Sequence, residues 1–120
     1  MRLVRFKTSK IEPSYGWVYG DKIGLIDGSP FGEYRRMEAE IDLNSVELLP
    51  PTQPSKIICV GRNYVDHARE HGVDVPEVPM LFLKPPSSLL AARRPIILPP
   101  QSSQVEHVCE MAVVIGKRGR

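Results

Sequence analysis

A histidine and a glutamate three residues apart, His67 and Glu70, are the pair in this sequence best suited to moving a proton. In a helix, residues at positions i and i+3 lie on one face, so these side chains can touch. A carboxylate beside an imidazole orients the ring and stabilises its charged form, which makes the histidine a general base. Spacing alone does not separate this role from an ordinary pair on a solvated helix face.

The same segment also fits the H-x-x-E-H pattern, in which two histidines one turn apart bind zinc and the glutamate serves as base. His67 and His71 would be the two ligands. The pattern lies in a short helix that Gly72 ends, and no third ligand is recognisable in the sequence. We therefore keep a zinc site as a minor alternative to proton transfer.

A further carboxylate, Glu110, stands next to an apolar run that predicts a buried strand at residues 111–115. Two glutamates at positions i and i+2 of a strand project from one face about 6 to 7 Å apart, close enough to share a hard divalent cation. Val108 occupies that partner position. Glu106 shares the face but lies about 13 Å away along an extended strand.

The element that must position the histidine and glutamate begins as an apolar run at residues 57–60, which is typical of a strand covered on both faces. Gly61 breaks this run. Asn63 is the expected N-cap of a helix over residues 64–71, and Gly72 is placed to end that helix in a left-handed conformation. Beyond it the chain is rich in proline, so we expect only short strands, at residues 80–83 and 96–98.

The first fifty residues predict a small β unit. We expect a first strand at residues 3–6, followed by a hairpin that pairs residues 17–19 with 22–26 across the two-residue turn Gly20-Asp21. Residues 31–40 give a weak signal that fits either a short helix or a loop. The following residues, 41–49, are expected to be extended.

Prolines then mark a stiff linker that cannot continue a sheet. We place an N-terminal β domain at residues 1–50, the linker at 51–54 and a second domain at 55–120. The predicted fold class is mainly β with short helices. Because the strand expected at 111–115 runs straight into a basic loop without its neighbours, we expect the second domain to be incomplete in this sequence.

The net charge of +2 is too small, and the basic residues too scattered, to indicate a nucleic-acid or membrane-surface partner. No apolar segment is long enough to cross a membrane, and the N-terminus lacks the apolar centre of a signal peptide. We therefore expect a cytoplasmic protein with no nucleic-acid and no membrane partner.

Three ordered motifs resemble the fumarylacetoacetate hydrolase family. The first is the sequence GRNY at residues 61–64 with His67 and Glu70, the second is FLKPPSS at residues 82–88, and the third is EMAVVIGK at residues 110–117. The resemblance covers residues 55–120, and the preceding β unit is similar to the N-terminal appendage of many members. It implies a mixed β-roll that acts on small 2-oxo or 1,3-dicarbonyl acids with Mg²⁺ or Mn²⁺, and it makes a homodimer the expected assembly.

By the same resemblance the reaction is carbon–carbon bond hydrolysis, decarboxylation or keto–enol isomerisation. A cation chelated by a 2-oxo acid would stabilise the enolate, and the protein would then move a proton. The implied roles follow the motifs: His67 and Glu70 are the proton-moving dyad, Arg62 and Lys84 hold the substrate carboxylate or build the pocket, Ser87 and Ser88 shape the adjacent loop, and Glu110 is a metal ligand.

The sequence departs from the family at the metal site. Members usually carry a glutamate at the position of Val108, and a third carboxylate in a part of the domain that this sequence does not contain. A single carboxylate is little to hold a cation that dehydrates reluctantly. An inactive family remnant, or a fragment that depends on a partner chain, is therefore the alternative to an active enzyme.

Overall fold

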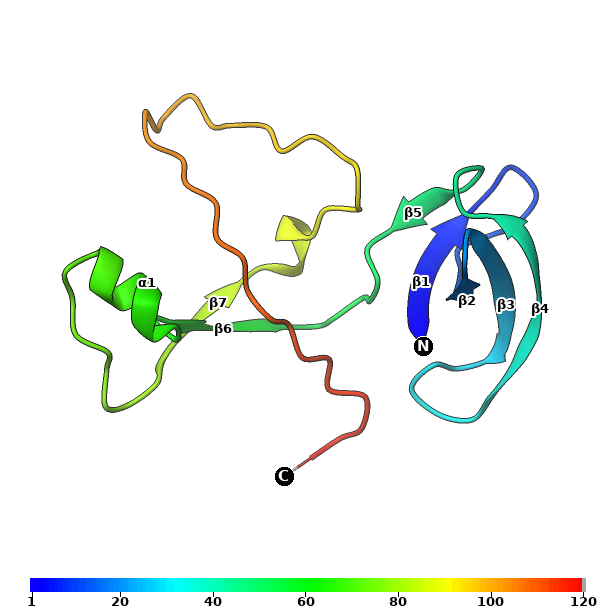
Figure 1. Cartoon of the computed structure of the whole chain (residues 1–120), viewed down its shortest axis with the longest axis horizontal. Coiled ribbons are helices and arrows are strands. Elements are labelled where there is room, and N and C mark those ends of the chain that lie inside the picture. The colour runs from blue at the N-terminus through cyan, green and yellow to red at the C-terminus, as the bar shows by residue number, and fades with distance from the viewer. Residues whose placement is uncertain (120) are drawn as a thin grey trace. The chain divides into compact units, whose positions relative to one another are not determined.

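The computed structural model describes residues 1–119, which separate into two compact units. One unit contains residues 1–52 together with 90–119, and the other spans Gln53–Leu89. Strands dominate the first unit, and the second combines two strands with the helical elements described, one α-helix and one 3₁₀ turn (Figure 1). The predicted fold class, mainly β with short helices, is confirmed. The domain boundary placed at residues 51–54 stays a prediction.

The first unit is built on an antiparallel sheet of five strands in the order β4-β3-β2-β1-β5. Their bounds are Arg2–Lys7 for β1, Ser14–Tyr19 for β2, Lys22–Gly28 for β3, Tyr34–Asp42 for β4 and Glu47–Leu49 for β5. The predicted hairpin is confirmed, because β2 pairs with β3 and Tyr19 lies opposite Lys22. Gly20 turns the chain with a φ of +58°, a conformation that glycine adopts without steric cost.

The core of this unit is small. Phe6 of β1 and Ile23 of β3 are fully buried, and Val18 of β2 is nearly so. Burying a side chain of this size stabilises a fold by about 1.5 to 3 kcal/mol, so these residues hold the sheet together. Partly buried aliphatic side chains surround them: Val4, Ile11, Leu25, Ile41, Leu43, Val46 and Leu48.

The segment at residues 31–40 contains no helix: residues 31–33 lie in a loop, and the remainder is a strand. It forms most of β4, which pairs with β3 through a ladder interrupted by two register shifts. Helix-favouring residues such as Met37 and Ala39 are thus overruled by cross-strand pairing, as happens when tertiary contacts outweigh local propensity. The tight connection before it is closed by hydrogen bonds between Ser29 and both Gly32 and Glu33.

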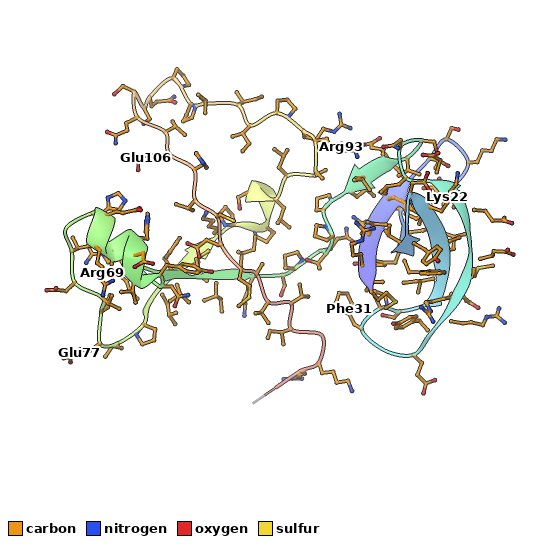
Figure 2. All side chains as sticks on the ribbon, viewed as in Figure 1. Lys22, Phe31, Arg69, Glu77, Arg93 and Glu106 are labelled. Carbon is orange, nitrogen blue, oxygen red and sulfur yellow. The ribbon has the colours of Figure 1, made fainter. Side chains whose placement is uncertain are left out.

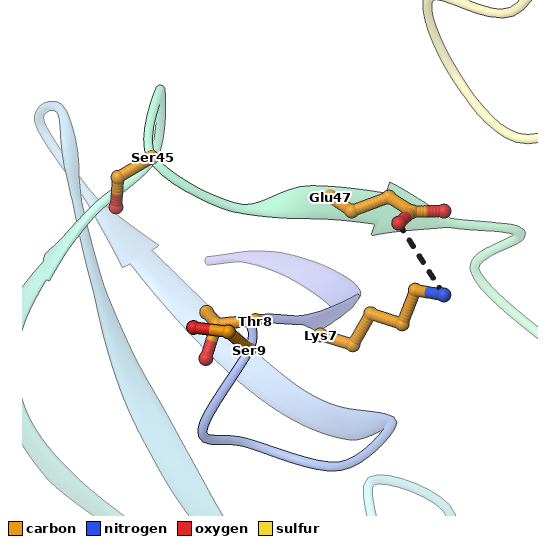
Figure 3. A pocket seen from close by; sticks show the side chains of 5 residues that line it. All are labelled: Lys7, Thr8, Ser9, Ser45 and Glu47. Atoms are coloured by element: carbon orange, nitrogen blue, oxygen red, sulfur yellow. Dashed lines mark ion pairs between the residues drawn. The ribbon is translucent and has the colours of Figure 1, made fainter.

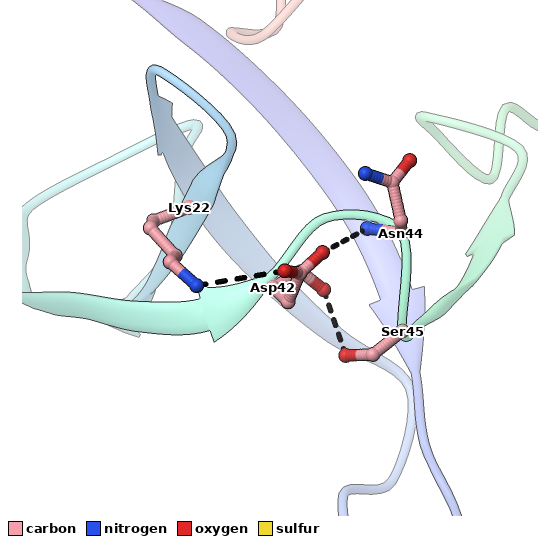
Figure 4. Close-up of polar contacts among 4 residues, drawn as sticks. All are labelled: Lys22, Asp42, Asn44 and Ser45. Atoms are coloured by element: carbon pink, nitrogen blue, oxygen red, sulfur yellow. Dashed lines mark hydrogen bonds and ion pairs between the residues drawn. The ribbon is translucent and has the colours of Figure 1, made fainter.

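The predicted extended stretch at 41–49 is interrupted by a turn between β4 and β5. The Asp42 carboxylate accepts a hydrogen bond from the Asn44 N–H at 2.7 Å, and the Asp42 carbonyl accepts one from the Ser45 hydroxyl at 2.8 Å (Figure 4). Lys22 lies 3.5 Å from the same carboxylate. The Asn44 hydrogen bond, with help from Lys22, holds the pKa of Asp42 below its usual value.

The second unit is a two-stranded antiparallel hairpin that carries a helix in its connection. The strands are β6, Ile57–Gly61, and β7, Met80–Lys84, and both were predicted. Helix α1 spans Val65–Glu70 between them, and the 3₁₀ turn η1, Pro86–Ser88, follows β7 (Figure 1). The predicted N-cap at Asn63 is wrong, because Tyr64 occupies that position without a side-chain capping hydrogen bond.

The strands predicted at residues 96–98 and 111–115 are not formed. Within residues 1–119 neither segment takes part in a strand ladder, and side chains such as Ile97 and Ile115 are largely exposed. An apolar run becomes a strand only where a neighbour supplies its backbone hydrogen bonds. Among the described residues, no helix is both long and apolar enough to cross a membrane.

Candidate active site

His67 and Glu70 lie on one face of α1, as their spacing predicts. The Nδ1 atom of His67 is 4.0 Å from Oε2 of Glu70. This separation is longer than a hydrogen bond. The Glu70 side chain is 77% exposed, so it has room to rotate and close the gap, while the His67 side chain is 42% exposed. The pair can therefore orient an imidazole whose other nitrogen stays available to a substrate.

A third side chain, His71, contacts His67 from the end of the helix. Its ring meets that of His67 edge to face, with centroids 4.6 Å apart and an angle of 73° between the planes. An aromatic pair of this geometry contributes about 0.5 to 1.5 kcal/mol. An exposed ion pair contributes about 0 to 1 kcal/mol. The contacts of His67 with His71 and with Glu70 therefore have comparable free energies.

Helix α1 is anchored at two points. Ala68 is its one buried residue among those described, with 1% exposure. At the C-terminal end of the helix, Gly72 adopts a φ of +63°, as predicted. The Gly72 N–H donates to the Arg69 carbonyl at 2.9 Å, and the Val73 N–H donates to the Ala68 carbonyl at 3.0 Å. This is a Schellman motif, which ends a helix at a defined residue.

Arg62 turns the chain from β6 toward α1 in a strained conformation. Its φ is +52°, in the left-handed region that costs a residue with a side chain about 1 to 2 kcal/mol. Such strain is common at binding and catalytic sites. The Arg62 side chain is exposed, and its predicted role toward a substrate carboxylate stays a prediction.

Lys84 and the serine loop lie at the other end of the hairpin. Lys84 pairs with Ile57, whereas Gly61, which precedes Arg62, pairs with Met80. Four residues along a strand span about 13 Å, so the backbones of Lys84 and Arg62 are not neighbours. Ser88 donates its hydroxyl to the Pro85 carbonyl at 2.7 Å, which closes the turn that also contains Ser87. The roles of Lys84, Ser87 and Ser88 also stay predictions.

Glu110 is exposed and lies outside any strand. The described residues contain no group of three or more histidine, cysteine, aspartate or glutamate side chains that could hold a metal ion. Binding of the expected Mg²⁺ or Mn²⁺, with Glu110 as a ligand, stays a prediction. The same finding leaves His67 and His71 without a third ligand among residues 1–119, as a zinc site would require.

A hollow in the first unit, about 400 Å³ in volume, is lined by none of the predicted site residues. Its lining residues are Lys7, Thr8, Ser9, Ser45 and Glu47 (Figure 3). Glu47 is bound by Arg94 at 2.7 Å and by Lys7 at 3.3 Å. Hydrogen bonds from Arg94 first, and then from Lys7, lower the pKa of Glu47. The charges are thus compensated within the unit, which makes the hollow a poor candidate for a charged ligand.

Sequence reasoning missed two features of α1 and its approach. His71 was considered only as a zinc ligand, although its i, i+4 spacing from His67 also permits ring contact. The left-handed Arg62 had no signal of its own, since arginine is not enriched in that conformation.

Two family models match the chain. Residues 56–120 match "Fumarylacetoacetate (FAA) hydrolase C-terminal", and residues 1–51 match "Rv2993c-like, N-terminal". The human mitochondrial oxaloacetate tautomerase FAHD2A is 49% identical over 73 residues, which are 61% of this chain and 23% of the relative. The rat mitochondrial oxaloacetate tautomerase Fahd2a is 39% identical over 145 aligned positions, covering all of this chain and 46% of the relative. The chain thus spans less than half the length of these relatives.

Solved structures agree with the sequence matches. An uncharacterized protein from Mycobacterium abscessus superposes with a TM-score of 0.67 at 35% identity, over 84% of this chain and 40% of that one. Cg1458, solved with an inhibitor, gives a TM-score of 0.59 at 36% identity, over 73% and 36% of the two chains. The matched domain includes every residue predicted to act in the site, from Arg62 to Glu110. This chain belongs to the fumarylacetoacetate hydrolase family.

Proposed function

We propose that this protein catalyses keto–enol interconversion of a small 2-oxo acid, with His67 and Glu70 moving the proton. The observation that carries the proposal is the shared face of α1, where Nδ1 of His67 lies 4.0 Å from Oε2 of Glu70. Two similar proteins are named oxaloacetate tautomerases, which supports this reaction over hydrolysis or decarboxylation.

In the proposed reaction Glu70 accepts a hydrogen bond from Nδ1–H of His67, so that Nε2 carries the free electron pair. Nε2 then removes a proton from the carbon next to the substrate carbonyl, the C–H electron pair forms the C=C bond, and the C=O π pair moves onto oxygen. The imidazolium of His67 returns its Nε2 proton to that oxygen, which gives the neutral enol and restores the base. The reverse sequence restores the ketone. Arg62 and Lys84, which lie at opposite ends of the β6–β7 hairpin, are the proposed cationic residues that hold the substrate carboxylate or build the pocket.

A divalent cation would stabilise the enolate oxygen if it were bound. Glu110 stays the proposed ligand. Since the described residues do not assemble a coordination set, no step above depends on the cation.

The test measures how fast oxaloacetate enol is converted to ketone, followed by the loss of its ultraviolet absorbance. Replacing His67 by Gln is expected to reduce the rate above background by about 100-fold or more, the usual contribution of a general base. Glu70→Gln is expected to cost less. Arg69→Ala is the matched control, because Arg69 is on the same helix and pairs with Asp66 at 3.3 Å instead of with the dyad. No rate above background, or a His67→Gln variant as fast as the parent, would refute the proposal.

A second candidate is that this chain acts only when it is paired with another chain. We propose that the other chain is a second copy of the protein. The observation favouring it is the apolar face of the β6–β7 hairpin, where Ile58, Leu81 and Leu83 are each more than 60% exposed. Soluble monomers rarely leave such a contiguous patch uncovered. A cooperative unfolding transition and a monomeric mass by light scattering, both independent of concentration, would exclude this candidate.

A further inference from the structure

His71 takes no part in the proposed proton transfer, yet its backbone is fixed relative to His67. It is the C-cap of α1, and its N–H donates to the His67 carbonyl at 3.3 Å. The Schellman hydrogen bonds of Gly72 and Val73 hold the chain immediately after it. The His71 ring therefore starts from a backbone position that the helix end determines.

The two imidazole rings meet at the edge-to-face geometry that aromatic pairs prefer, 4.6 Å between centroids and 73° between planes. Glu70 and His71 are both exposed, but the Glu70 carboxylate lies 4.0 Å from His67, beyond hydrogen-bond distance, whereas the His71 ring contacts the His67 ring. A flexible carboxylate at that distance leaves the rotation of the His67 ring weakly defined. A ring held against one side of His67 restricts that rotation.

We propose that His71 is a positioning residue, which holds the His67 ring with Nδ1 toward Glu70 and leaves Nε2 directed at the substrate. This inference rests on the proposed function for its catalytic consequence, but the ring orientation itself is a property of the protein alone. Figure 2 shows α1 with Arg69, the control position, labelled on the same helix.

The first readout is nuclear magnetic resonance of the ¹⁵N-histidine-labelled chain at about pH 8, where imidazoles are ordinarily neutral. The sequence has three histidines, and His107, outside α1, serves as an internal reference. We expect cross-relaxation between the ring protons of His67 and His71, and a His67 tautomer with the proton on Nδ1. His71→Ala should mix the tautomers of His67, whereas His71→Phe, which keeps an aromatic edge, should preserve the Nδ1–H form. Arg69→Ala should leave both signals unchanged.

The second readout is turnover of oxaloacetate enol. His71→Ala is expected to lower kcat by about 2- to 10-fold, the range that an aromatic pair can supply, with KM unchanged, and His71→Phe should restore it. Far-UV circular dichroism of each variant checks that α1 persists, which is expected because the backbone N–H of residue 71 remains.

The two readouts separate the two ideas. Unchanged His67 signals in His71→Ala would overturn the positioning role, whatever the activity. Mixed His67 tautomers in His71→Ala that recover in His71→Phe would support the positioning role. This holds even if neither the parent protein nor any variant turned over the enol, because the absence of turnover would refute only the proposed function. Loss of turnover in both His71 variants, with intact tautomers, would also overturn the positioning role.

Discussion

Replacing Gly24 by Ala should destabilise the first unit more than its small size suggests. Gly24 lies on β3 beneath the Trp17 side chain, whose indole N–H crosses the sheet to donate to the Met37 carbonyl at 2.8 Å. A Cβ atom at position 24 would overlap both the indole nitrogen and that carbonyl oxygen, and would approach the Glu38 carbonyl to 2.9 Å. Because two of these atoms belong to backbone, the neighbours cannot simply rotate away.

The expected cost follows from the contacts that would be lost. Overpacking by one methyl group costs about 1 to 3 kcal/mol. Losing the indole hydrogen bond adds about 1 kcal/mol. Arg36 lies 4.9 Å from the centre of the Trp17 ring, and disturbing this exposed cation–π contact adds about 0.5 kcal/mol. Since these terms overlap, we expect the free energy of unfolding to fall by about 2 to 4 kcal/mol.

Urea denaturation followed by tryptophan fluorescence measures this change, because Trp17 is the only tryptophan and reports on the first unit. The matched control is Gly32→Ala, where an added Cβ meets no atom within 4 Å and the φ is not positive. The control should change the free energy of unfolding by less than about 1 kcal/mol. Equal midpoints for the two variants would refute the steric argument. If the Gly24 variant does not fold, Trp17→Phe, which removes the indole N–H together with part of the ring, should still cost at least about 1 kcal/mol. Because this variant has no tryptophan, its unfolding is followed by far-UV circular dichroism.

Three further predictions concern the helix end, acid stability and the cation. Gly72→Ala should destabilise α1 by about 1 to 2 kcal/mol, seen as lost helical circular dichroism, because its φ is +63°. The free energy of unfolding should fall on acidification, because folding lowers the pKa values of Asp42 and Glu47. The stabilisation by these two carboxylates is fully present above their unfolded-state pKa values, near 4, and is lost as the pH drops through their folded-state pKa values. Val108→Glu should strengthen Mn²⁺ binding in calorimetry by giving Glu110 a neighbouring carboxylate.

Each of these predictions has a matched control. Gly72→Asn should cost less than Gly72→Ala, because asparagine tolerates the left-handed conformation; equal costs would contradict the backbone argument. For acid stability, Asp42→Asn should flatten the pH dependence of the free energy of unfolding. The control Asp74→Asn, at an exposed position, should leave that pH dependence unchanged. For the cation, the control is Val105→Glu, which adds the same charge five residues from Glu110. Equal Mn²⁺ affinities of Val105→Glu and Val108→Glu would mean that the added charge, and not its position beside Glu110, strengthens binding.

The sequence placed the elements whose determinants are local. The hairpin turn at Gly20, the strand before Gly61 and the helix end at Gly72 were all predicted, because each depends on a glycine at a defined φ or on a short apolar run. The shared face of His67 and Glu70 follows from helical spacing in the same way.

The elements that sequence reasoning misplaced depend on distant partners. Strand β4 exists because β3 offers it hydrogen bonds, which no pattern within residues 31–40 could reveal. The run at 111–115 has the composition of a buried strand, yet it pairs with no strand within residues 1–119. Its composition therefore predicted a capacity to pair, whereas pairing itself requires a neighbour.

The same distinction applies to the site. The proposed proton-moving pair, His67 and Glu70, needs only one turn of helix and a fixed helix end, and α1 supplies both through Ala68 and Gly72. A cation site needs more than one carboxylate, and Val108 stands at the position from which a second carboxylate would be nearest to Glu110 in the sequence. Changes at His67 should therefore affect proton transfer even where no cation binds, whereas changes at Glu110 should affect it only to the extent that the cation contributes. Comparing Glu110→Gln with His67→Gln, each with and without Mn²⁺, measures that contribution directly.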